Sequence, residues 1–195
     1  MRWNKQWKRV VFVPKDRVGD AISETPALSF LDRIGVEVIV LSTSYTSQIF
    51  ENNPHVFRNV TYSRRKRDGW IKVGLVNHDV VNEIKQLAPD AFLCMFRQIR
   101  ELERIYSHIH VPVLSKPMNN NLPIYMRWVE FFRMFGFDAQ SSRNEIYPGE
   151  KDIDLVEQWM YKTGVDPARP IVVIHPGCAV SKKDRNIANA LKCWP

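Results

Sequence analysis

The sequence has few cysteines and no long apolar run. Its 195 residues include only Cys94, Cys178 and Cys193, an odd number without the spacing of a disulfide framework or a metal site. Free thiols of this kind are typical of a reducing compartment. No apolar run approaches the roughly 20 residues that a membrane-spanning helix needs. These absences argue against a disulfide-stapled or a membrane-spanning protein.

The N-terminal residues have positive charge but lack the apolar segment of a secretory signal. The apolar run that follows the basic residues 1–9 is Val10–Val13, only four residues long. A signal peptide has about 7–15 apolar residues at this point. We therefore expect a cytoplasmic protein.

Motifs for nucleotide cofactors and for metals are also missing. The sequence contains neither the Gly-x-Gly-x-x-Gly fingerprint of dinucleotide enzymes nor the Gly-x-x-x-x-Gly-Lys-Ser/Thr loop of nucleoside triphosphatases. The histidines show no ligand spacing. Asp152 and Asp154 fall in a predicted first helical turn, where the helix dipole favours acidic side chains. We expect no cofactor and no metal.

Basic charge is in excess and is concentrated in one place. Lys and Arg number 28 against 21 Asp and Glu, a net charge of +7. The basic stretch consists of Arg64, Arg65, Lys66 and Arg67. Such a run is either a solvated loop or a contact for an anionic partner such as a lipid surface or an acidic glycan. No nucleic-acid-binding module accompanies it, so we expect no nucleic acid partner.

Short apolar strands alternate with amphipathic helices along the chain. Strands are predicted over 10–13, 37–41, 59–62, 91–96, 111–114 and 171–174, and helices over 77–87, 98–108, 124–135 and 152–162. This alternation predicts an α/β fold with a doubly wound parallel sheet. The aromatic side chains of helix 124–135 are expected in the core. A polar, linker-like segment follows, so we expect a complete domain over 1–145 and the beginning of a second over 146–195.

The stretch Val10–Leu28 places a carboxylate where such sheets bind ligands. After the strand 10–13 comes a loop in which Gly19 is free to adopt backbone angles that other residues avoid. A helix is predicted to begin between Asp20 and Pro26, with Thr25 as a candidate cap. Asp20 then lies at the carboxyl edge of the sheet, as a general base or as a helix cap.

Three motifs follow one another along the chain. They are Val18–Leu28 (Val-Gly-Asp-Ala-Ile-Ser-Glu-Thr-Pro-Ala-Leu), Asn52–Val56, and His175–Gly177 with Lys192–Pro195. They resemble the motifs of family 9 glycosyltransferases, the lipopolysaccharide heptosyltransferases. The resemblance implies a GT-B fold of two facing α/β domains, the second truncated here at Pro195. It therefore leaves the activity of the 195-residue chain itself in question.

The same resemblance implies a reaction and assigns residues to it. The reaction is inverting, metal-independent transfer of a heptose or related sugar from an ADP-activated donor to an acidic lipopolysaccharide-core acceptor. Asp20 is implied as the base that takes the acceptor proton. Lys192 is implied as a contact for the donor phosphates, with Ser181, Lys182 or Lys183 as alternatives for that role.

Basic residues near the same sheet edge are candidates for holding the acidic acceptor. Lys15, Arg17 and Gly19 lie in the predicted loop before Asp20, and Arg97 and Arg100 follow the predicted strand 91–96. Guanidinium groups bind carboxylates and phosphates in a bidentate manner. A role as solvated surface charge is the alternative for each of the four basic side chains.

The implied acceptor is a lipid at the cytoplasmic face of the membrane. We therefore expect the basic stretch to dock the protein on that anionic surface as a peripheral protein. A direct grip of the same stretch on the acceptor is the alternative. A second hypothesis for the whole chain is a non-catalytic domain that binds an acidic glycolipid or a protein partner.

Overall fold

The computed structural model describes residues 3–62, 66–67, 70–71, 78–94, 100–115, 121–140 and 142–173. The chain divides into two compact units, Met1–Gly149 (unit 1) and Glu150–Pro195 (unit 2). The assignment of 1–145 and 146–195 to two α/β domains stays a prediction. No helix in the described part of the chain combines the length and apolarity that crossing a bilayer requires.

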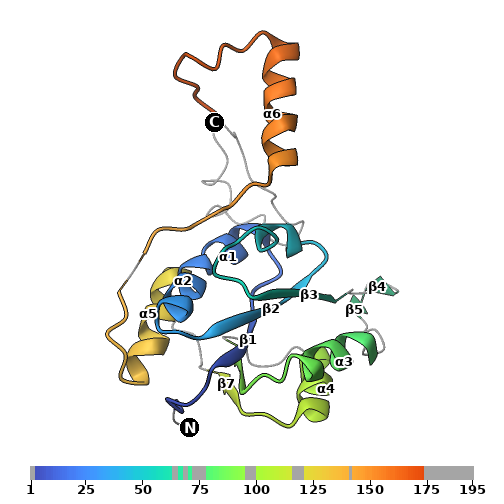
Figure 1. The fold of residues 1–195 in the computed structure, drawn as a ribbon, viewed down its shortest axis with the longest axis vertical. Coiled ribbons are helices and arrows are strands. Elements are labelled where there is room, and N and C mark those ends of the chain that lie inside the picture. Colours follow the sequence, from blue (N-terminus) through green and yellow to red (C-terminus); the bar gives the residue numbers. More distant parts are fainter. Residues whose placement is uncertain are drawn as a thin grey trace. The chain divides into compact units, whose positions relative to one another are not determined.

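Unit 1 is built on a five-stranded parallel sheet (Figure 1). Its strands are β1 (Arg9–Val13), β2 (Glu37–Thr43), β3 (Arg58–Tyr62), β6 (Ala91–Cys94) and β7 (Val113–Ser115). They lie in the order β3-β2-β1-β6-β7, and each neighbouring pair is parallel. Val11 in the central strand is paired with Ile39 on one side and Phe92 on the other. The predicted doubly wound α/β sheet is confirmed.

Helices cover both faces of this sheet. The helices are α1 (Val18–Ile22), α2 (Thr25–Arg33), the short 3-10 helix η1 (Ser47–Ile49), α3 (His78–Gln86), α4 (Arg100–Ile109) and α5 (Ile124–Met134). Successive strand residues point to opposite faces. Val10 and Phe12 therefore pack in the core that includes α2 and α5, and Val11 and Val13 pack in the core that includes α3 and α4.

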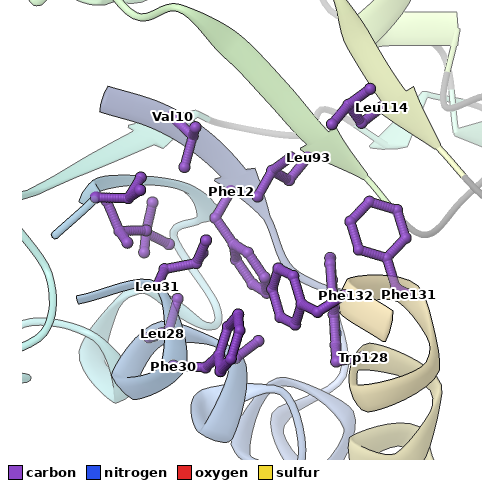
Figure 2. Close-up of a cluster of buried hydrophobic side chains, with 14 of the residues drawn as sticks. Val10, Phe12, Leu28, Phe30, Leu31, Leu93, Leu114, Trp128, Phe131 and Phe132 are labelled. Atoms are coloured by element: carbon purple, nitrogen blue, oxygen red, sulfur yellow. The ribbon is translucent and has the colours of Figure 1, made fainter. Parts of the chain in front are cut away.

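An aromatic cluster joins α5 to the sheet and to α2 (Figure 2). The ring centroids of Phe12 and Trp128 are 4.6 Å apart, and those of Phe30 and Phe132 are 4.4 Å apart. Trp128, Phe131 and Phe132 are buried, which confirms the core position predicted for the aromatic face of this helix. Such rings contribute most of the apolar area buried in a core of this size. Helix α5 is thus fixed against β1, the strand that leads into Asp20.

The segment after β1 confirms its prediction in part. A helix begins between Asp20 and Pro26 as predicted, namely α2 from Thr25, but a short helix that was not predicted, α1 from Val18, precedes it and holds Asp20. Gly19 is helical and has no positive φ, so its predicted special backbone angle is wrong. Thr25 is the first residue of α2 rather than its cap. Backbone bonds from Ser23 N–H to Gly19 O and from Glu24 N–H to Ala21 O close α1.

Unit 2 contains α6 (Glu150–Thr163), which confirms the predicted helix over 152–162. Gly164 follows with φ 69°, a left-handed angle that ends helices readily. The strand predicted over 171–174 is wrong for the described residues 171–173, which have no strand structure and are exposed. A strand needs a neighbour for its backbone hydrogen bonds, and the described part of unit 2 supplies none.

The basic stretch is only partly described. Lys66–Arg67 forms β4, which pairs antiparallel with β5 (Trp70–Ile71). A short antiparallel strand pair therefore lies within the segment predicted as a loop. Arg64 and Arg65 lie outside the described residues.

Candidate active site at the carboxyl edge of the sheet

The order of the strands reverses at β1. Strands β2 and β3 follow it on one side, whereas β6 and β7 lie on the other side. The connections that leave β1 and β6 therefore diverge, and open α/β sheets bind ligands in the crevice formed at such a point. The connection after β1 holds Lys15, Arg17, Gly19 and Asp20. The candidate site is this edge of unit 1.

Asp20 lies in the first turn of α1, and its side chain is 33% exposed. The Nζ atom of Lys15 is 3.7 Å from the Oδ2 atom of Asp20, and the Lys15 side chain is only 13% exposed. Arg17, not Asp20, is at the N-cap position of α1, and no side-chain capping bond occurs there. A carboxylate that water can reach and that faces an ammonium group can accept a proton from a bound hydroxyl.

Gly19 contributes open space beside Asp20. A Cβ atom built at Gly19 would meet no heavy atom within 4 Å. Gly19 is exposed, as are its neighbours Arg17 and Val18. This surface is therefore accessible to a substrate, although the reason differs from the backbone freedom that the sequence predicted.

Glu24 is a member of the site that the sequence reasoning missed. Its side chain is fully buried, and its Oε2 atom accepts a hydrogen bond of 2.7 Å from the backbone N–H of Lys15. Burial raises the pKa of Glu24 to about 8, and the nearby charge of Asp20 adds to the rise. The backbone N–H and the charge of Lys15 oppose it. No local sequence signal marks Glu24, because it lies at the N-cap of α2, outside the helix that carries Asp20.

The segment that follows α5 is held on unit 1 by Thr25. The Oγ1 atom of Thr25 accepts the backbone N–H of Glu145 at 2.9 Å and donates to Ile22 O at 2.8 Å. The segment predicted as a linker is therefore attached to the beginning of α2.

Several predicted site residues cannot be placed. Arg97, Ser181, Lys182 and Lys192 lie outside the described residues. Arg100 begins α4 after β6, on the connection expected to face Asp20, but its side chain also lies outside the description. Among the residues that the structure describes, no group of His, Cys, Asp or Glu side chains is arranged to hold a metal ion.

The fold belongs to a known class. No family model matches the sequence, and no curated protein matches it. Among solved structures, unit 1 has the α/β fold found in glycosyltransferases of the GT-B type.

Three of these structures are glycosyltransferases of bacteria. A family 9 glycosyltransferase from Veillonella parvula is similar with a TM-score of 0.68 and 14% identity over 85% of this chain and 52% of its own. Escherichia coli heptosyltransferase WaaC, solved with ADP, is similar with a TM-score of 0.57 and 13% identity over 70% of this chain and 50% of its own. Escherichia coli ADP-heptose lipopolysaccharide heptosyltransferase II is similar with a TM-score of 0.56 and 9% identity over 83% of this chain and 52% of its own.

The chain spans about half the length of these solved structures. At such low identities the similarity establishes a common fold. It does not by itself carry the activity, the donor or the acceptor to this chain.

Proposed function

We propose that this chain contains the acceptor-side domain of a family 9 glycosyltransferase and the beginning of its donor-binding domain. The observation that carries the proposal is the position of Asp20, at the carboxyl edge of the central strand of a fold that three glycosyltransferases share. The motif Val18–Leu28, which resembles the opening signature of that family, forms the site itself.

In this proposal Asp20 acts as the general base. Its carboxylate takes the proton of the acceptor hydroxyl while the hydroxyl oxygen bonds to the anomeric carbon of the donor sugar. The bond from that carbon to the nucleoside diphosphate breaks, and the diphosphate leaves with its electron pair. A single displacement of this kind inverts the anomeric configuration. Base catalysis by one side chain contributes about 10²–10⁴-fold to such a rate.

The donor in this proposal is an ADP-activated heptose or a related sugar. Two solved neighbours support it, because one was solved with ADP and another is described as an ADP-heptose transferase. Lys192, or Ser181 and Lys182, would contact the diphosphate. Lys15, Arg17, Arg97 and Arg100 would hold an acidic lipopolysaccharide-core acceptor, because they follow the strands that end at this edge.

We extend the proposal to the place of action, the inner face of the cytoplasmic membrane. Each basic side chain near an anionic surface contributes about 1 kcal/mol, so the four residues of the basic stretch supply a few kcal/mol. Binding to vesicles of anionic lipid should weaken with salt and on replacement of Arg64–Arg67 by serine. Absence of binding at low salt would leave the direct grip on the acceptor as the role of this stretch.

The activity itself is tested by a transfer assay with ADP-heptose and an anionic lipopolysaccharide-core acceptor. The assay uses the 195-residue chain and any longer product of its gene. Asp20→Asn should lower the transfer rate by about 10²–10⁴-fold while acceptor binding is kept. The matched control is Asp138→Asn, which removes an exposed carboxylate after α5 and should leave the rate unchanged. Acceptor binding without any Asp20-dependent transfer would favour the non-catalytic binding domain.

A further inference from the structure

A buried carboxyl group lies beneath the loop that carries the site. Glu24 is 0% exposed, and its Oε1 atom has no hydrogen-bond partner among the described residues. The indole Nε1 atom of Trp128 is likewise buried without a hydrogen-bond partner among the described residues. Its N–H nevertheless lies close enough to Glu24 to lower the pKa of that carboxyl group. Buried polar atoms of this kind are costly and uncommon in native cores. Their presence next to Asp20 calls for a reason.

The contacts of Glu24 lead to Asp20 in two steps. Glu24 Oε2 holds the backbone N–H of Lys15 at 2.7 Å. The side chain of the same lysine extends to Asp20, with Nζ 3.7 Å from Oδ2. The position of the Lys15 ammonium group therefore depends on the Lys15 backbone, which the hydrogen bond to Glu24 holds in place.

We propose that Glu24 is a positioning residue of this site, whose buried carboxyl holds the Lys15 backbone so that the Lys15 ammonium faces Asp20. The inference rests on the proposed function, in which Asp20 takes the acceptor proton. Glu24 does not touch the substrate. It acts through Lys15.

The protonation state of Glu24 matters for this role. The charged groups that act on it are Lys15 in the loop and Asp20 in α1, and Trp128 on α5 adds an N–H donor. With a pKa of about 8, Glu24 is mostly neutral at pH 7, and in this form it attracts the Lys15 ammonium less than a carboxylate would. Ionisation above that pH creates a second carboxylate that attracts the same ammonium group. The arrangement around Asp20 therefore changes as the pH rises through about 8.

The test follows the backbone amide of Lys15 by NMR in the 15N-labelled chain. Its chemical shift should titrate with a midpoint near pH 8, because it is bonded to the ionising Glu24 carboxyl. Asp20→Asn should lower this midpoint, since the Asp20 charge raises the pKa of Glu24. Lys15→Met should raise it, since the Lys15 charge lowers that pKa. Glu24→Gln should abolish the titration.

Hydrogen exchange of the Lys15 amide at pH 6 measures how strongly Glu24 holds the Lys15 backbone N–H. Glu24→Gln keeps an acceptor oxygen, so the Lys15 amide should stay protected. Glu24→Leu removes the acceptor, so exchange should speed up by about tenfold, the change expected for loss of one buried hydrogen bond. If Glu24→Leu does not fold, the glutamine variant and the two midpoints still decide the question.

Two results would overturn the inference. One is a Lys15 midpoint that is the same in the wild type, in Asp20→Asn and in the control Asp138→Asn. The other is an unprotected Lys15 amide in the wild type. None of these measurements needs a sugar donor, so a failure of the proposed transfer reaction is seen separately, in the transfer assay.

Discussion

The two ends of strand β1 differ in how their polar groups are paired. At the amino end, Asp90 Oδ2 accepts the backbone N–H groups of Lys8 and Arg9 at 2.7 Å and 2.9 Å. The Arg9 guanidinium bonds to Glu37 Oε2 and to Leu87 O. At the carboxyl end, the buried Oε1 atom of Glu24 has no hydrogen-bond partner among the described residues, and the side chain of Asp20 is 33% exposed.

The paired polar groups at the amino end of β1 serve stability, whereas those at the carboxyl end are arranged for function. The amino end uses its polar groups on one another and so fixes the beginning of the central strand. The carboxyl end places an exposed carboxylate, an ammonium group and a buried acid close together, and the burial of an unpartnered Glu24 oxygen costs stability. Polar groups kept at such a cost are characteristic of functional sites. The two ends can therefore be tested against each other.

The largest effect on stability is expected from the buried acid. The unfolded chain loses the Glu24 proton near pH 4.5, whereas the folded chain keeps it until about pH 8. The free energy of unfolding should therefore fall as pH rises between these values, by about 1.4 kcal/mol per pH unit from this group, and the contribution is fully kept below pH 4.5. Glu24→Gln should remove this fall.

Denaturant unfolding of the wild type and of Glu24→Gln at pH 5 and pH 7.5 measures the effect. The free energy of unfolding of Glu24→Gln should rise relative to that of the wild type as the pH rises. An equal pH dependence of the two proteins would mean that Glu24 ionises normally in the fold.

A smaller effect is expected at the amino end. Asp90→Ala leaves the N–H groups of Lys8 and Arg9 without their acceptor, which should lower the free energy of unfolding by about 1–3 kcal/mol. Thermal unfolding measures the loss. Transfer and acceptor binding, measured below the new midpoint, should be unchanged. A transfer defect in the folded variant would place function at both ends of β1.

The smallest effect is expected from Gly19→Ala. Gly19 is helical and the added methyl group meets no atom, so the free energy of unfolding should rise by about 0.5–1 kcal/mol. The same methyl group occupies open space next to Asp20 and should weaken acceptor binding. Calorimetry and a binding titration on one preparation measure both. A variant that binds the acceptor normally would show that this space is not used.

The frame of unit 1 was predictable because its inner strands β1, β2 and β6 are short, mostly apolar and buried on both faces. The apolar runs Val10–Val13 and Ala91–Cys94 are typical of strands in the middle of a parallel sheet. Asp20 was also predictable, because its motif follows the first strand directly. Features that depend on contacts between residues far apart in the sequence were not predictable.

Glu24 illustrates the limit. Its burial depends on the Lys15 loop and on Trp128, far along the chain on α5, and no local pattern announces that meeting. Gly19 was misjudged because α1 has only five residues, too few to show a helical period. The strand predicted over 171–174 was judged from its apolar run alone, although a strand depends on neighbours that local sequence does not show.

The most direct test of the account is to map where this chain binds an anionic lipopolysaccharide-core oligosaccharide. The amino end is a real competitor, because it has a hollow lined by Gln6, Lys8, Arg9, Glu37 and Asp90. Amide chemical shifts recorded during a titration separate the two ends. We expect the changes to centre on Lys15–Glu24 and to be lost on Lys15→Met with Arg17→Met. Changes that centre on Lys8, Arg9 and Asp90 instead would contradict the account.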